Sequence, residues 1–206
     1  MTESSFRLRI KKKRQEERRR MLALFLGLGI MLLAFGVYFL SQFESMQKSY
    51  LYPYPYREMV EQYAADYKID SSLVASVIMN ESKFKNDVHS HRGAVGLMQL
   101  MPDTAEWIAQ QLDDAAFSVE RLHEPAMNIR YGTWYLASLK KEFKGNEVLA
   151  LAAYNAGRGN VHEWMQENHW GMDFQDAAAI PYEETRAYVM RVLKDRQKYQ
   201  ELYGAR

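Results

Sequence analysis

The feature that most constrains this chain is a run of 20 uncharged residues at 21–40, MLALFLGLGIMLLAFGVYFL. At ~1.5 Å per residue a helix of this length spans about 30 Å, which matches the hydrocarbon core of a bilayer. The run is apolar on every side, so it lacks the polar face that a surface helix of a soluble domain would need. The sequence therefore predicts one N-terminal transmembrane helix over residues 21–40.

The charges on either side of this run predict its orientation. Residues 1–20 carry nine Lys/Arg and three acidic residues, whereas residues 41–206 carry 18 Lys/Arg and 23 acidic residues. Lys/Arg next to a span stays on the cytoplasmic side, so residues 1–20 are expected to form a cytoplasmic tail and the remainder to lie across the membrane. A cleaved signal peptide is the competing interpretation, but its apolar region usually runs ~7–15 residues before a small-x-small site.

Residues 41–56 end in YLYPYPY, where alternating Tyr and Pro disfavour a helix and suit an extended spacer. We expect the folded domain to occupy residues 57–203. Its acidic balance argues against nucleic acid as a partner. Because the chain has no cysteine, disulfides and thiolate metal sites are excluded.

The domain shows helical periodicity and no convincing strand pattern, so we expect an all-α fold. Asp70 or Ser71 is a predicted N-cap for a helix that ends in Glu81, Pro102 opens a second helix, and Gly157 is expected to cap a helix that starts at Asn146. Further helices are expected over NIRYGTWYLASLK and after Pro181.

Glu81 is the residue that most invites a functional interpretation. In SSLVASVIMNESKF it shares one helix face with Val74, Val77 and Ile78, so a carboxylate stands on the last turn of an apolar stripe. It is either a helix-end carboxylate that reaches water, or a group that a site holds partly out of water. Two other stretches carry polar groups beside glycines: GAVGLMQLMP with Gln99, and ALAAYNAGRGN with Tyr154 and Asn155.

The five histidines predict no metal site. HSH lacks the carboxylate–histidine helical motif of metal enzymes, so we interpret the set as surface histidines. They are His89, His91, His123, His162 and His169.

These motifs stand in one order along the chain: NESKF, GAVGLMQLMP, NIRYGTWYL, ALAAYNAGRGNV and IPYEETRAYV. Together they resemble the soluble-lytic-transglycosylase (SLT) family over about residues 57–200. The resemblance implies a lysozyme-like, goose-type helical domain that cleaves peptidoglycan without metal or cofactor. It places the single catalytic acid/base at Glu81, and substrate contacts at Ser90, Gln99, Tyr154, Asn155 and Tyr188. Family members often have NP after ESxF, where this chain has Lys85-Asn86, and His91-Arg92 precedes Gly93 here.

The implied reaction cleaves the β-1,4 bond between N-acetylmuramic acid and N-acetylglucosamine, and the 6-hydroxyl of the muramoyl sugar closes a 1,6-anhydro ring. Two alternatives remain open: a hydrolytic, lysozyme-type muramidase, and a non-catalytic peptidoglycan-binding module. The expected partners are glycan strands and, through residues 21–40, the membrane, with the domain on the cell-wall side. The residues identify no protein partner.

Overall fold

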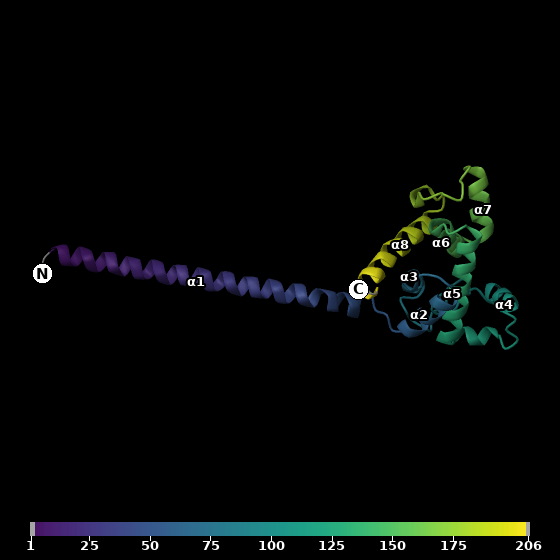
Figure 1. Ribbon diagram of the computed structural model, residues 1–206, viewed down its shortest axis with the longest axis horizontal. Coiled ribbons are helices and arrows are strands. Elements are labelled where there is room, and N and C mark those ends of the chain that lie inside the picture. The colour runs from purple at the N-terminus through teal and green to yellow at the C-terminus, as the bar shows by residue number, and fades with distance from the viewer. Residues whose placement is uncertain (1–2, 205–206) are drawn as a thin grey trace. The chain divides into compact units, whose positions relative to one another are not determined.

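The computed structural model describes residues 3–204, with side chains from residue 11 onward except at 41 and 44. The chain divides into two compact units, and the boundary in the sequence falls between Leu51 and Tyr52 (Figure 1). The first unit is a helix, α1 (Glu3–Met46), followed by a π-helical turn at Gln47–Leu51. Its stretch Lys11–Leu40 is long and apolar enough to cross a membrane, and none of it is buried in protein. Residues 3–20 and 41–46 therefore continue the helix beyond the expected span of 21–40.

The second unit is helical, as the periodicity predicted, and its described residues contain only isolated β-bridges, at His89–Val95 and Val95–Leu100. Its α-helices are α2 (Arg57–Asp66), α3 (Ser71–Glu81), α4 (Pro102–Gln111), α5 (Pro125–Glu142), α6 (Glu147–Ala156), α7 (Arg158–Glu167) and α8 (Glu183–Tyr203). Two 3₁₀ turns, Val119–His123 and Ala177–Ala179, lie between them.

Helix α6 lies at the centre of this unit and packs against α5, α7 and α8. All six residues from Val148 to Ala153 are buried, and the alanines among them allow neighbouring helices to approach closely. Helix α3 packs along α8, burying Leu73 to Ile78 in the same core. A smaller second core joins α4, the turn at Val119–His123 and the first half of α5.

The Tyr/Pro stretch departs from the expected spacer over 41–56. Tyr52, Tyr54 and Tyr56 pack against the main core, and the hydroxyls of Tyr199 and Tyr203 in α8 donate to the carbonyls of Pro53 (2.9 Å) and Tyr52 (2.7 Å). The Tyr54 ring stands edge-on to the Tyr199 ring at 5.4 Å. Residues 52–56 are not helical. Their tyrosine rings bury apolar area against the domain instead of being exposed to water. The second unit therefore begins at Tyr52.

Candidate active site

Glu81 reaches its position because α3 is well defined at both ends. The Asp70 carboxylate caps the helix by accepting from the backbone N–H of Ser72 at 2.8 Å. Six consecutive residues after this cap are fully buried, which fixes the helix against α8. The helix ends at Glu81, so its side chain emerges half-buried where the apolar packing stops.

A cavity of about 540 Å³ opens at this point. Its walls come from the end of α3, the loop before α4, the end of α6 and the first turn of α8. Five of the six residues that the sequence predicted for the site line it: Glu81, Ser90, Gln99, Tyr154 and Asn155. The remaining lining residues are His91, Arg92, Ala94, Met101 and Glu184.

The environment of Glu81 favours its protonated form. Burial raises the pKa of this carboxyl group to about 7, while the nearby Tyr188 hydroxyl and the positive charge of Arg191 act in the opposite direction. Tyr188 is only 3% exposed and is not among the residues that line the cavity. Its hydroxyl faces Glu81 and has no partner in conventional hydrogen-bond geometry among the described residues. A carboxyl group with this pKa can donate a proton near neutral pH.

The loop between α3 and α4 brings backbone and amide groups to the cavity. Gly93 and Gly96 have φ angles of +89° and +80°, which other residues adopt rarely. Gln99 also has a positive φ, of 48°, and its amide N–H₂ donates to the carbonyls of Val88 (3.0 Å) and Gly96 (2.8 Å). Gln99 therefore holds the loop closed while it lines the cavity.

Ser90, Tyr154 and Asn155 differ in how they are held. The Ser90 hydroxyl accepts from the backbone N–H of Ala94 at 2.9 Å, so it shapes the loop. The Tyr154 hydroxyl donates to the carbonyl of Met98 at 2.8 Å and ties α6 to the same loop. Asn155 is exposed, and no described residue bonds its side chain, so its amide is available to a ligand.

Several supporting residues were missed by the sequence reasoning. The Asn128 amide in α5 is fully buried; it accepts from the N–H of Met98 (2.7 Å) and donates to the carbonyls of Val95 and Leu122 (both 2.9 Å). A Cβ on Gly132 would come within 2.7 Å of the Met98 Cβ. The segment NIRYGTWYL thus supports the cavity loop from behind. A polar Asn and a Gly inside a helical pattern were the only signals.

Asp87, Asp103 and Glu184 are the residues that the sequence offers as a possible second carboxylate. Glu184 lines the main cavity and, with Arg92 and Asn155, a smaller adjoining cavity of about 210 Å³. Asp87 and Asp103 line neither cavity, and Asp103 stands exposed in the first turn of α4. Glu184 is therefore the second carboxylate of the cavity.

All five histidines are exposed. The rings of His89 and His123 lie 4.9 Å apart, and His91 lies at the cavity wall. Across the part of the chain that the structure describes, no group of three His, Asp or Glu side chains is arranged to hold a metal ion.

The fold and the cavity define a lysozyme-like helical domain with one carboxyl group of raised pKa at its centre. The family described as Transglycosylase SLT domain matches residues 58–176, and the chain belongs to this family. The soluble lytic murein transglycosylase of Escherichia coli K12 is 34% identical over 144 residues, which cover 69% of this chain and 22% of that protein. The membrane-bound lytic murein transglycosylase C of Haemophilus ducreyi is 32% identical, covering 70% of this chain and 45% of that protein.

Solved structures of lytic transglycosylases are also similar to this chain. The 70-kDa soluble lytic transglycosylase of E. coli superposes with a TM-score of 0.69 at 34% identity, covering 74% of this chain and 25% of that chain. An inactive mutant of the lytic transglycosylase Slt from Pseudomonas aeruginosa gives a TM-score of 0.67 at 34% identity, covering 75% and 25%. The chain thus corresponds to about a quarter of these larger proteins.

Proposed function

We propose that this chain is a peptidoglycan lytic transglycosylase in which Glu81 is the only acid/base. The observation that carries the proposal is the half-buried Glu81 carboxyl group, whose pKa is raised to about 7 in a cavity of about 540 Å³. Membership of the SLT family and the names of the relatives support the same reaction. Glu81 is present, which argues against a non-catalytic binding module.

In this mechanism protonated Glu81 gives its proton to the glycosidic oxygen, and the bond from that oxygen to C1 of the muramoyl sugar breaks. The 6-hydroxyl oxygen of the same sugar bonds to C1 and transfers its proton to the Glu81 carboxylate. The products are a 1,6-anhydromuramoyl end and a new N-acetylglucosamine 4-hydroxyl, and Glu81 returns to its protonated form. No water is consumed, so one carboxyl group is sufficient.

The other residues of the proposed site have positioning roles. Asn155 offers a free amide to sugar hydroxyls or acetamido groups. Gln99, Ser90 and Tyr154 hold the loop that lines the cavity together with Glu81, through the hydrogen bonds described above. Tyr188 interacts with Glu81 and would orient its carboxyl group. Holding a substrate in a reactive geometry contributes to the rate without any further chemistry.

Hydrolysis is the second candidate because Glu184 provides another carboxylate in the same cavity. Glycosidases that use water need such a second group, either as a base or as a nucleophile. The two reactions give different products. After borohydride treatment, an anhydro end is about 20 mass units lighter than the reduced end that hydrolysis leaves.

The decisive experiment combines the Glu81→Gln substitution with mass spectrometry of digested cell wall. Wild-type protein should release anhydro-ended muropeptides. The variant keeps the side-chain shape but loses the proton, so we expect a loss of about 10²–10⁴-fold in rate. Glu184→Gln is the matched control and should leave anhydro products. Ordinary reducing ends from the wild type would instead identify a hydrolase that uses Glu184.

Asn155→Ala and Gln99→Ala test the positioning roles. Asn155 is exposed and unbonded, so its loss should raise KM while leaving the melting temperature unchanged. Gln99 joins two backbone carbonyls, so its replacement should lower both activity and melting temperature. If Asn155→Ala destabilised the protein as much as Gln99→Ala, the assignment of Asn155 to substrate binding would be wrong.

We further propose that α1 anchors the protein, with residues 21–40 in the membrane, residues 1–20 in the cytoplasm and the catalytic domain on the cell-wall side. The exposed apolar stretch of α1, the basic residues before it and the membrane-bound relatives support this topology. Protease added to intact protoplasts should degrade the catalytic domain. Protection of that domain would contradict the proposed orientation.

A further inference from the structure

A second pocket, of about 480 Å³, lies where the end of α2 meets the second half of α5. It has no lining residue in common with the catalytic cavity. Aromatic rings form its walls at Tyr67 and Trp134, Ile69 and Ala137 contribute apolar surface, and lysines stand at its edge. The catalytic mechanism uses none of these residues.

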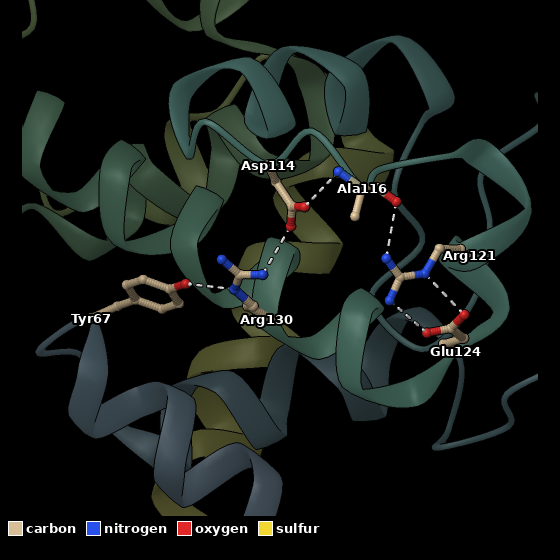
Figure 2. Close-up of polar contacts among 6 residues, drawn as sticks. All are labelled: Tyr67, Asp114, Ala116, Arg121, Glu124 and Arg130. Atoms are coloured by element: carbon tan, nitrogen blue, oxygen red, sulfur yellow. Dashed lines mark hydrogen bonds and ion pairs between the residues drawn. The ribbon is translucent and has the colours of Figure 1, made fainter.

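The aromatic walls are held in place from outside the pocket. Arg130 donates through Nε to the Tyr67 hydroxyl at 3.4 Å, and its Nη1 forms an ion pair with Asp114 at 2.9 Å, as Figure 2 shows. The Trp134 ring packs against the Trp107 ring, with centroids 5.6 Å apart. Since both rings are fixed before a ligand arrives, little side-chain entropy would be lost on binding.

The lysines around the pocket differ in their partners. Lys140 is bound to Glu147 at 2.7 Å and has a structural role. Lys68 and Lys141 are exposed, and neither forms an ion pair within residues 11–204. Lys68 has a φ angle of +55° just after α2, a left-handed position that usually holds glycine or asparagine. A lysine there is less favourable for the backbone, but it brings a free ammonium group to the pocket.

We infer that this pocket binds a short peptide that carries carboxylates, and that the peptide is the stem peptide of peptidoglycan. The inference rests on the proposed function. Two free ammonium groups complement carboxylates, and the fixed aromatic walls suit the small apolar residues of such a peptide. Neutral glycan would leave both lysines unused. The pocket therefore holds a peptide-bearing strand at a place separate from the site of cleavage.

The test measures binding of a soluble N-acetylated stem tetrapeptide to the full chain in neutral detergent by equilibrium dialysis. Replacing both lysines, as Lys68→Asn with Lys141→Gln, should weaken binding about 10-fold or more, as expected for lost charge-assisted hydrogen bonds. Asparagine tolerates the left-handed backbone at residue 68. The same tetrapeptide with its D-glutamate α-carboxylate amidated should also bind more weakly to the wild type.

Lys144→Asn is the matched control, because Lys144 also follows a helix with a positive φ, of 53°, and does not line the pocket. It should bind the peptide as the wild type does, and so should Glu81→Gln. Unchanged binding in the double-lysine variant would overturn the inference. Loss of binding in Glu81→Gln would also overturn it, because the peptide would then occupy the catalytic cavity. Cleavage products are measured in a separate experiment. If the proposed reaction were wrong, the result of the binding experiment could therefore still be interpreted.

Discussion

Glu81 and Asp114 are surrounded by similar groups, but their pKa values are shifted in opposite directions. Each carboxyl group lies beside a buried tyrosine, Tyr188 or Tyr131, whose hydroxyl has no conventional hydrogen-bond partner within the described residues. Each also lies near an arginine. Yet the pKa of Glu81 is raised to about 7, whereas the pKa of Asp114 lies below its ordinary value.

The difference comes from what touches the carboxylate oxygens. Burial acts to raise both pKa values. At Asp114 this effect is outweighed, because Tyr131 faces it, the Ala116 N–H donates at 3.2 Å and Arg130 forms an ion pair at 2.9 Å (Figure 2). At Glu81, Arg191 acts only through its charge, since its Nε is bonded to Asn80 at 3.3 Å. An arginine that forms an ion pair, as at Asp114, keeps the carboxyl group ionised. An arginine that acts only through its charge, as at Glu81, leaves a carboxyl group that can still donate a proton near neutral pH.

The largest expected effect comes from replacing each of the two carboxyl groups by its amide. Glu81→Gln should lower the rate about 10²–10⁴-fold with no loss of stability. Asp114→Asn should keep the rate of the folded protein but lower the free energy of unfolding by about 1–2 kcal/mol. Cleavage assays and melting temperatures on the same samples test this. Substantial activity loss in a well-folded Asp114→Asn protein would show that the two regions are not functionally separate.

The pH dependence of stability should also differ in sign. The folded pKa of Glu81 is about 7 against an ordinary 4.5, so ionisation costs folding free energy as pH rises through that range. Glu81→Gln should therefore match the wild type at pH 4 and exceed it in free energy of unfolding by about 3 kcal/mol at pH 8. Asp114 has a lowered pKa, so its contribution exists above its ordinary 3.8 and is lost as pH falls below that value. Melting temperatures from pH 3 to 8 test both signs.

The residues that the sequence could place are those defined by local pattern. The Asp70 cap, the apolar stripe of α3 and the Gly157 stop of α6 all lie where the sequence predicted them. Five candidate residues then meet at one cavity because each motif ends a helix or forms the loop between two helices.

What the sequence could not place depends on contacts between distant residues. The Tyr199 hydroxyl reaches Pro53 across 146 positions, and the local pattern of YLYPYPY predicted only an extended spacer. Asn128 holds Met98 across 30 positions, and only the folded loop shows why a helix contains this amide. Glu184 enters the cavity because α8 starts there, and helix starts do not reveal which neighbours they meet.

A smaller effect is expected when each arginine is replaced by glutamine. Arg130→Gln removes the ion pair, so the pKa of Asp114 should rise toward its ordinary value and the melting temperature should fall. Arg191→Gln removes a charge near Glu81 and the hydrogen bond to Asn80, but no ion pair with Glu81. The pKa of Glu81 should therefore rise slightly, and the alkaline limit of activity should move up by less than about one pH unit. Carboxyl chemical shifts and pH–rate profiles measure these changes. A drop in the Glu81 pKa would contradict the role given to Arg191.

The smallest expected effects come from the two tyrosines. Tyr188→Phe removes the hydroxyl that acts to lower the pKa of Glu81, so the alkaline limb of the pH–rate profile should move upward by a fraction of a unit. The rate at the optimum should fall modestly, because the carboxyl group is less well oriented. Tyr131→Phe is the matched control, since its hydroxyl faces Asp114 in the second core. It should leave the profile unchanged, and equal shifts in both variants would show that the tyrosines act through stability alone.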